Sequence, residues 1–348
     1  YFQATTYTGG GANTEVTNGG NSDLKPDFLW IKNRTAGYAH FVVDSNRNIS
    51  YAQNSSNAPY LETDSTAVEN NNQNWMQSVN TNGFTTGISE HINNNSGSEF
   101  VAWQWKANGG TTSSLSNTGP DSVVQVNSDA KFVIGTYTGN GSNSNVKHGL
   151  GETPDMLIVK RRTGGTGSWA VWHKDLTTAY WLRLDTTVAQ ASGVWDGLNP
   201  NSEKFFISGG SSNVNISGSD YVFYAWKSVQ GYSKFGKYVG NGNANGPFVY
   251  TGFKPAWIML KPISAVDNWI IVDNKRDPSN GANAAQKRLF PDTAGAEGTG
   301  YAVCDMLSNG FKMRATSTSW NGNGTTYIYM AFAENPFVTS TGIPTTAR

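Results

Sequence analysis

The chain has 348 residues, with 25 basic and 25 acidic side chains and a net charge of zero. A neutral chain lacks the basic surface that nucleic acid or an anionic membrane would need, and no apolar run could span a bilayer, so we expect neither partner. The single cysteine excludes an intramolecular disulfide, and 12 Trp, 15 Tyr and 16 Phe supply a dense core instead. These features fit folding in a bacterial cytoplasm.

One pattern of residues occurs three times along the chain. Each copy opens with Tyr-Thr-Gly or Tyr-Val-Gly, continues with a proline that precedes a lysine by six residues, and closes with alanine before an aromatic residue. These landmarks are Tyr7, Pro26, Lys32 and Trp103; Tyr137, Pro154, Lys160 and Trp226; and Tyr238, Pro255, Lys261 and Phe332. A repeat of about a hundred residues is longer than a solenoid unit and predicts a repeated domain.

Each copy has the pattern of several short strands. An alternating opening strand, as at residues 132–137, ends in a glycine-rich turn. The proline then leads into a wholly apolar strand, which is typical of a strand covered on both faces by a neighbouring copy or subunit, although a twisted edge of one sandwich remains an alternative. These apolar strands lie at residues 28–31, 156–159 and 257–260, and further strands are predicted near residues 40–44, 169–173 and 269–273.

Strands therefore dominate the predicted fold, and residues 284–287 are the only short helical candidate. Many short strands with turn-rich joints predict an all-β chain of three tandem antiparallel β-sandwich or jelly-roll domains. We place the domains at residues 1–107, 131–230 and 231–337, with a flexible Gly/Ser/Thr-rich linker at 108–130 and an extended tail at 338–348. The second and third domains should be rigidly apposed. Tyr1 already lies in the first opening strand, which leaves open a start or leader before it.

Several motifs of the first copy match a known module. The matching segments are residues 26–34 (Pro-Asp-Phe-Leu-Trp-Ile-Lys-Asn-Arg), 43–47, 82–84 and 101–106. Together they resemble a module of bacteriophage virion proteins, widespread in marine and cyanobacterial phages, that is similar to the concanavalin A-like lectin/glucanase and SPRY sandwich folds. The other copies match less closely, with His173 at the position of Asp44, and Ala256 at that of Asp27. The resemblance implies a structural virion protein and transfers no catalytic residue.

Candidate catalytic groups are few. Glucanases of this fold place carboxylates at alternate positions of one strand, and the sequence has no Glu-x-Asp-x-Glu or Asp-x-Asp. The nearest pair is Glu62 with Asp64, whereas Asp292 and Glu297 fall in a Gly/Ala-rich loop. No nucleophile triad or phosphate-binding loop is present. The four histidines are dispersed. We therefore expect no catalytic residue, no metal site and no cofactor.

Two further features carry predictions: a repeated spacing of aspartate and arginine, and two isolated tryptophans. Asp44 and Asp273 each precede an arginine by three residues, which predicts a turn whose carboxylate accepts backbone N–H groups and pairs with the arginine. Trp195 and Trp320 lie in Gly/Asn/Ser-rich stretches. Each indole is a candidate for stacking on a sugar ring, and the alternative is local or intersubunit packing.

The sequence thus favours a non-enzymatic structural protein of a phage particle, forming a fibre, spike or capsid-decorating appendage that contacts host surface glycans. We expect other virion proteins and possible host surface polysaccharide as partners, a location on the virion surface, and assembly in the host cytoplasm. A homotrimer would cover the apolar strands and open sheet edges. The alternative functions are a carbohydrate-binding lectin or adhesin and, third, a polysaccharide depolymerase.

Overall fold

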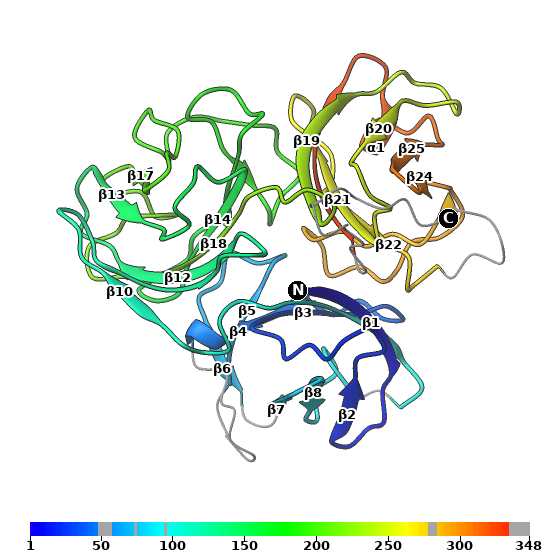
Figure 1. Cartoon of the computed structure of the whole chain (residues 1–348), viewed down its shortest axis with the longest axis horizontal. Coiled ribbons are helices and arrows are strands. Elements are labelled where there is room, and N and C mark those ends of the chain that lie inside the picture. Colours follow the sequence, from blue (N-terminus) through cyan, green and yellow to red (C-terminus); the bar gives the residue numbers. More distant parts are fainter. Residues whose placement is uncertain (48–57, 73–74, 94–95, 278–283, 334–348) are drawn as a thin grey trace.

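The computed structural model describes residues 1–47, 58–72, 75–93, 96–277 and 284–333, and within them the chain is all-β. Its sheets are antiparallel and open, and helix is confined there to the 3-10 turn η1 (Ser45–Arg47) and the single turn α1 (Thr318–Asn321). No helix in these ranges is long and apolar enough to cross a membrane. Figure 1 shows the sheets gathered into three lobes around a common centre.

Each lobe pairs a larger sheet with a smaller one. The first lobe has the strand orders β1 (Phe2–Thr8), β9 (Glu99–Trp105), β3 (Phe28–Asn33), β4 (Phe41–Asp44), β5 (Ala58–Glu62), β6 (Asn70–Asn72) and β2 (Thr14–Thr17), β8 (Gly83–Thr86), β7 (Met76–Asn80). The second has β10 (Ser113–Leu115), β11 (Ser122–Asn127), β12 (Phe132–Thr138), β18 (Asp220–Trp226), β14 (Met156–Arg161), β15 (Ala170–His173), β16 (Leu182–Arg183) and β13 (Ser144–Lys147), β17 (Lys204–Ile207). The third has β19 (Ser233–Val239), β26 (Thr326–Phe332), β21 (Trp257–Pro262), β22 (Ile270–Asp273) and β20 (Phe248–Tyr250), β25 (Gly310–Met313), β24 (Cys304–Leu307), β23 (Ala284–Ala285).

The sequence repeat is a repeat of strand pairing. In every lobe the opening strand pairs with the closing strand, and the closing strand pairs with the proline-led strand. The registers agree as well: the opening tyrosine lies opposite an aromatic residue in the pairs Tyr7↔Phe100, Tyr137↔Tyr221 and Tyr238↔Tyr327. Each of these pairs stacks its rings with centroids 5.0 or 5.1 Å apart. The registers also correct one landmark, because Trp105 and not Trp103 is the equivalent of Trp226 and Phe332.

The proline-led strands alternate between two cores, because successive side chains of a strand point to opposite faces. In β3, Leu29 and Ile31 lie in the core of the first lobe, whereas Phe28 and Trp30 lie in a core shared by all three lobes. The equivalent shared-core residues are Met156, Ile158, Trp257 and Met259, and the equivalent lobe-core residues are Leu157, Val159, Ile258 and Leu260. The predicted cover on both faces is confirmed: the lobe's own core covers one face, and neighbouring copies within the chain cover the other.

This arrangement changes the argument for a homotrimer. The expected subunit contacts were to cover the apolar strands, and that cover lies within one chain. Aromatic rings from different lobes meet there directly: Trp257 of the third lobe lies 5.5 Å from Trp105 of the first lobe, centroid to centroid. The homotrimer stays a prediction, without the support of uncovered apolar strands.

A buried asparagine explains why each copy opens with the Tyr-x-Gly motif. Tyr7, Tyr137 and Tyr238 each donate their hydroxyl to the backbone oxygen of a core residue, at 2.6 Å in every lobe. The acceptors are Ile92, Val214 and Trp320, and the next residues are Asn93, Asn215 and Asn321. The asparagine Oδ1 accepts a backbone N–H of the glycine-rich loop in each case. This clasp ties the opening turn to the chain just before the closing strand.

Two local predictions are wrong. Residues 108–130 do not form a flexible linker throughout, because β10 and β11 extend the larger sheet of the second lobe. Val124 is buried in the core of that lobe, and the Asn46 side chain of the first lobe donates to Val123 O at 2.9 Å. The helical candidate at 284–287 is also wrong, since β23 begins there. The predicted tail, 338–348, lies outside the described residues.

The shared core should make the three lobes unfold together. Trp257 is fully buried in it, so Trp257→Ala is expected to lower the free energy of unfolding by about 3–5 kcal/mol. Urea unfolding followed by fluorescence and by proteolysis of the first lobe should show one transition that moves as a whole. The comparison variant is Phe84→Ala, which removes a ring from the first lobe's own core and not from the shared core. Three separate transitions, of which Trp257→Ala moves one alone, would contradict a cooperative block.

Candidate functional site

Buried polar groups at the junctions between lobes are the first candidates for chemistry. One ring nitrogen per lobe bonds to a backbone oxygen of the next lobe: His40 Nε2 to Phe290 O at 3.0 Å, Trp169 Nε1 to Glu62 O at 2.8 Å, and Trp269 Nε1 to Arg183 O at 2.7 Å. His40 Nδ1 accepts from Trp30 Nε1, and burial holds the pKa of His40 well below its usual value. The imidazole is therefore neutral and donates through Nε2. The first lobe therefore bonds to the third, the second lobe to the first, and the third lobe to the second.

The lysine that follows each proline has the same cyclic role. Lys32, Lys160 and Lys261 are fully buried and donate to the next lobe's backbone at Ala294 O (3.1 Å), Ser65 O (3.2 Å) and Thr187 O (3.0 Å). Burial lowers the pKa of each ammonium to about 8. Because the contact recurs at all three junctions, we interpret these lysines as structural and not as nucleophiles.

A carboxylate accompanies each buried lysine. Asp64, Asp185 and Asp292 accept the backbone N–H of His40, Trp169 and Trp269 at 2.9, 2.8 and 3.1 Å. Burial raises the pKa of Asp292 to about 7, although the backbone N–H groups and the charge of Lys261 favour the carboxylate. The carboxylates that are close together in the sequence take part in different contacts. Asp292 accepts the N–H of Trp269, whereas Glu297 binds Arg34 at 2.9 Å. Asp64 accepts the N–H of His40, a contact that does not involve Glu62.

Two junctions carry chains of buried charges. Arg47 Nε lies 2.5 Å from Asp44 Oδ2 and its Nη1 lies 3.0 Å from Glu69, which in turn pairs with Arg162 of the second lobe at 2.9 Å. Burial pushes the pKa of Glu69 upward, but the hydrogen bond from Arg162 and the charge of Arg47 outweigh it and hold this pKa below its usual value. The Tyr224 hydroxyl of the second lobe also donates to Asp44, at 2.6 Å.

The second chain repeats the first between the third and first lobes. Its members are Asp273, Arg276, Glu297 and Arg34, with N···O distances of 2.6, 3.0 and 2.9 Å along the chain. The Trp103 indole takes the place of the Tyr224 hydroxyl and donates to Asp273 at 2.9 Å. Both aspartates accept backbone N–H groups of the turn, so the predicted Asp–Arg turn is confirmed.

The third junction lacks such a chain. His173 and Leu176 occupy the positions of the aspartate and arginine, and Ile263 occupies that of Arg34 and Arg162. The backbone contact persists, because Gln190 N donates to Ile263 O at 3.0 Å, as Glu69 N donates to Arg162 O. The Asp–Arg–Glu–Arg chain is therefore dispensable for the geometry of a junction. Within the described residues, no group of three or more His, Cys, Asp or Glu side chains could hold a metal ion.

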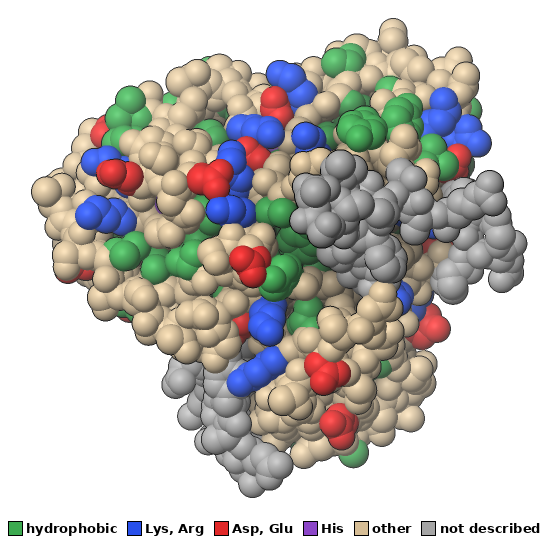
Figure 2. Space-filling view, viewed as in Figure 1, with side chains coloured by type: hydrophobic (Ala, Val, Ile, Leu, Met, Phe, Trp, Pro, Cys, Tyr) green, Lys and Arg blue, Asp and Glu red, His purple; other side chains and the backbone are tan. Residues whose placement is uncertain are grey.

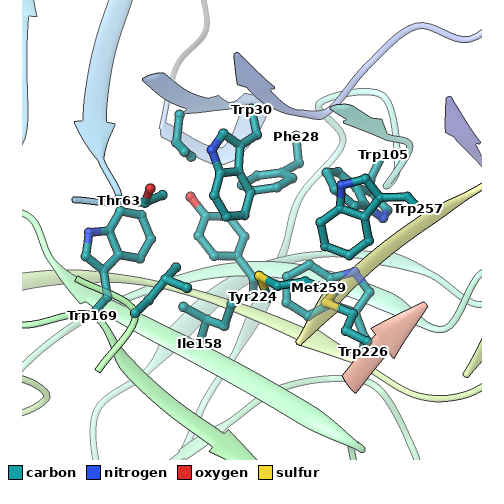
Figure 3. Close-up of a pocket in the computed structure, with 13 residues that line it drawn as sticks. Phe28, Trp30, Thr63, Trp105, Ile158, Trp169, Tyr224, Trp226, Trp257 and Met259 are labelled. Atoms are coloured by element: carbon teal, nitrogen blue, oxygen red, sulfur yellow. The ribbon is translucent and has the colours of Figure 1, made fainter. Parts of the chain in front are cut away.

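The shared core contains a small cavity of about 10 Å³ (Figure 3). Side chains of all three lobes line it, among them Phe28, Trp226 and Met259. A space of about one water molecule with an apolar lining stays dry. The two hydroxyl groups among the lining residues already have acceptors, since Thr63 donates to Pro291 O at 2.7 Å and Tyr224 donates to Asp44 at 2.6 Å. We therefore interpret this cavity as a packing gap.

The two candidate tryptophans differ in their surroundings. Trp195 is 1% exposed in the core of the second lobe, so its assignment as a sugar-stacking residue is wrong and the packing alternative holds. Its polar neighbours form the turn, while Trp195 itself belongs to the buried cluster that also contains Val194 and Val214. Trp320 is 5% exposed and packs in the core of the third lobe, but it also lines an open pocket.

This pocket is the candidate binding site. It has a volume of about 370 Å³ and is lined by Asn268, Arg288, Phe290, Tyr301, Ala315, Thr316, Ser317, Ser319 and Trp320. The Arg288 guanidinium carbon lies 5.6 Å from the centre of the Trp320 ring and 5.9 Å from that of Tyr301, which is 66% exposed. Sequence reasoning missed Arg288 and Tyr301, because neither belongs to the repeated pattern. The site combines aromatic rings, a cation and several hydroxyl groups.

The comparisons with known proteins identify a family. Residues 1–336 match the model of DUF7483, described as a domain of unknown function. The chain belongs to this family. The match spans all three lobes and so includes the shared core. No curated protein and no solved structure matches the chain.

The charged junctions give a testable asymmetry. Asp44→Ala leaves the buried Arg47 without its nearest carboxylate and is expected to cost about 3–5 kcal/mol in free energy of unfolding. The double change Asp44→His with Arg47→Leu installs the His173 and Leu176 pair of the third junction and should cost less than Asp44→Ala, because it removes the charges of Asp44 and Arg47 together. Urea unfolding of the three proteins measures this order. A double variant less stable than Asp44→Ala would contradict the interpretation.

The buried lysines predict a dependence of stability on pH. Their pKa of about 8 in the folded chain is below the usual 10.5, so the unfolded chain holds more protons between these values and the free energy of unfolding rises with pH. Each lysine contributes at most about 1.4 kcal/mol per pH unit. The difference between the wild type and Lys261→Met in urea unfolding from pH 8 to 10 isolates one lysine. Parallel profiles for the two proteins would contradict a lowered pKa.

Proposed function

We propose that the chain is a non-enzymatic structural protein of a bacteriophage particle, in which each lobe is a concanavalin A-like, jelly-roll β-sandwich module. The single observation that carries this proposal is the shared core, which joins three copies of one module into a block. Such a block suits a fibre, spike or capsid-decorating appendage, where a fixed shape matters more than a reactive group. The resemblance of residues 26–34 and 101–106 to phage virion modules supports the same assignment.

The use of the charged side chains supports a structural role. Of the carboxylates that the sequence offered as candidates, Asp64 and Asp292 accept backbone N–H groups, while Asp44, Asp273 and Glu297 belong to the buried ion-pair chains. A catalytic carboxylate instead needs access to substrate and to water. These groups therefore favour cohesion of the block over chemistry.

The surface fits assembly with other proteins. Figure 2 shows a face that is largely polar and uncharged, with positive and negative side chains interspersed. Such a surface resists nonspecific adhesion and leaves contacts to be made by shape and hydrogen bonds. We propose other virion proteins as partners and the surface of the particle as the location, with assembly in the cytoplasm of the bacterial host.

A lectin or adhesin is the second candidate, and one observation favours it. The pocket around Trp320 presents an exposed ring, Tyr301, beside polar side chains, which is a combination that binds sugars. Within a phage particle, the same pocket would supply the contact with host surface glycans.

Labelling of intact particles tests the virion assignment. Gold-labelled antibodies against the chain should mark purified particles of the encoding phage at one fixed place, on the head or on the tail. Particles that bind no antibody, although the chain is present in the lysate, would contradict the proposal. Release of reducing sugar from host polysaccharide by the purified chain would favour a depolymerase instead.

A further inference from the structure

Comparison of the three lobes separates what the fold needs from what one lobe adds. Trp320 occupies the position of Ile92 and Val214, since all three offer their backbone oxygen to the opening tyrosine. An aliphatic side chain is therefore sufficient for this core position in two lobes, where Ile92 and Val214 are fully buried. The indole of the third lobe extends beyond that requirement and lines the open pocket.

The cation of the pocket, Arg288, is held in place by a backbone oxygen and two aromatic rings. Arg288 donates to Thr299 O at 3.2 Å and lies over the rings of Trp320 and Tyr301. Among the residues that the structure describes, no carboxylate forms an ion pair with Arg288. A guanidinium held against aromatic rings is weakly hydrated and presents a planar fork that matches an anionic oxygen pair. The pocket therefore favours a negatively charged group.

The remaining lining indicates what carries that charge. Asn268, Thr316 and Ser317 offer amide and hydroxyl groups around the aromatic surface. The volume of about 370 Å³ lies at the small end of the range for ligand pockets and suits one or two sugar rings. A flat ring edged with hydroxyl groups satisfies both the aromatic surface and these polar side chains.

We propose that this pocket binds an acidic saccharide, with a uronic-acid or sulfated ring against Tyr301 and Trp320 and its anionic group on Arg288. The proposal rests on the glycan contact in the proposed function and is independent of the virion assignment. It names the class of glycan, and it limits recognition to the third lobe, since Arg288, Tyr301 and Trp320 belong to that lobe alone.

Binding of tri-galacturonate to the full chain, followed by isothermal titration calorimetry, tests the proposal with neutral galactotriose as the matched ligand. Arg288→Gln should weaken binding of tri-galacturonate about tenfold or more, because a hydrogen bond to a charged group is lost. Trp320→Val installs the side chain of the second lobe and should weaken binding severalfold without unfolding the lobe. A sulfated galactose disaccharide serves as the second acidic ligand.

Arg183→Gln is the matched control variant, since Arg183 lies 4.4 Å from the ring centre of Trp181 in the second lobe. It removes a comparable stacked guanidinium and should leave binding unchanged. Thermal melts confirm that each variant is folded. The proposal is overturned if neither acidic ligand binds at millimolar concentration, if galactotriose binds equally well, or if Arg288→Gln binds like the wild type. Any of these results leaves the virion assignment intact, because particle labelling tests that separately.

Discussion

Burial of the proline-led strands on both faces is the constraint on which the rest of the structure depends. Leu29 and Ile31 are buried in the core of their own lobe. Phe28 and Trp30, on the opposite face of the same strand, can be buried only by another lobe. An isolated lobe would expose a wide aromatic surface to water, which is costly because each ring buries a large apolar area. The three lobes are therefore mutually required, and the polar contacts at their junctions fix how they meet.

The junctions show that cohesion and specificity are supplied by different groups. Apolar burial and the cyclic backbone contacts occur at all three, whereas the Asp–Arg–Glu–Arg chain occurs at two. A buried ion pair contributes little net stability, because desolvation offsets the attraction between its charges. Its geometry is selective, however, since a wrong neighbour would leave Arg162 or Arg34 without the glutamate that pairs with it across the junction. We infer that the charged chains ensure that each lobe meets the correct neighbour.

Much of the fold could be predicted from local pattern, and the limits of that prediction are physical. The repeat, the doubly covered strands and the turn at Asp44 follow from spacing along the chain. The identity of the cover does not, because shared-core contacts join residues far apart, such as Trp105 and Trp257. The Gly/Ser/Thr-rich composition of residues 108–130 predicted a flexible linker, although the alternating valines of β11 are typical of a strand and β11 does pair in a sheet. Trp195 misled for a similar reason, since its neighbours describe the turn and not the direction of the indole.

The candidate site shows the same limit from another side. Arg288 and Tyr301 could not be found by their repetition, because the other copies lack them. The clasp asparagines could have been found, since Asn215 and Asn321 each precede the aromatic partner of the opening tyrosine by six residues.

Covalent linkage of the lobes has a consequence for valency: three separate chains would display every feature in triplicate, but here each lobe can diverge alone. With the saccharide pocket proposed above confined to the third lobe, multivalent attachment through it would come from arrays of whole chains.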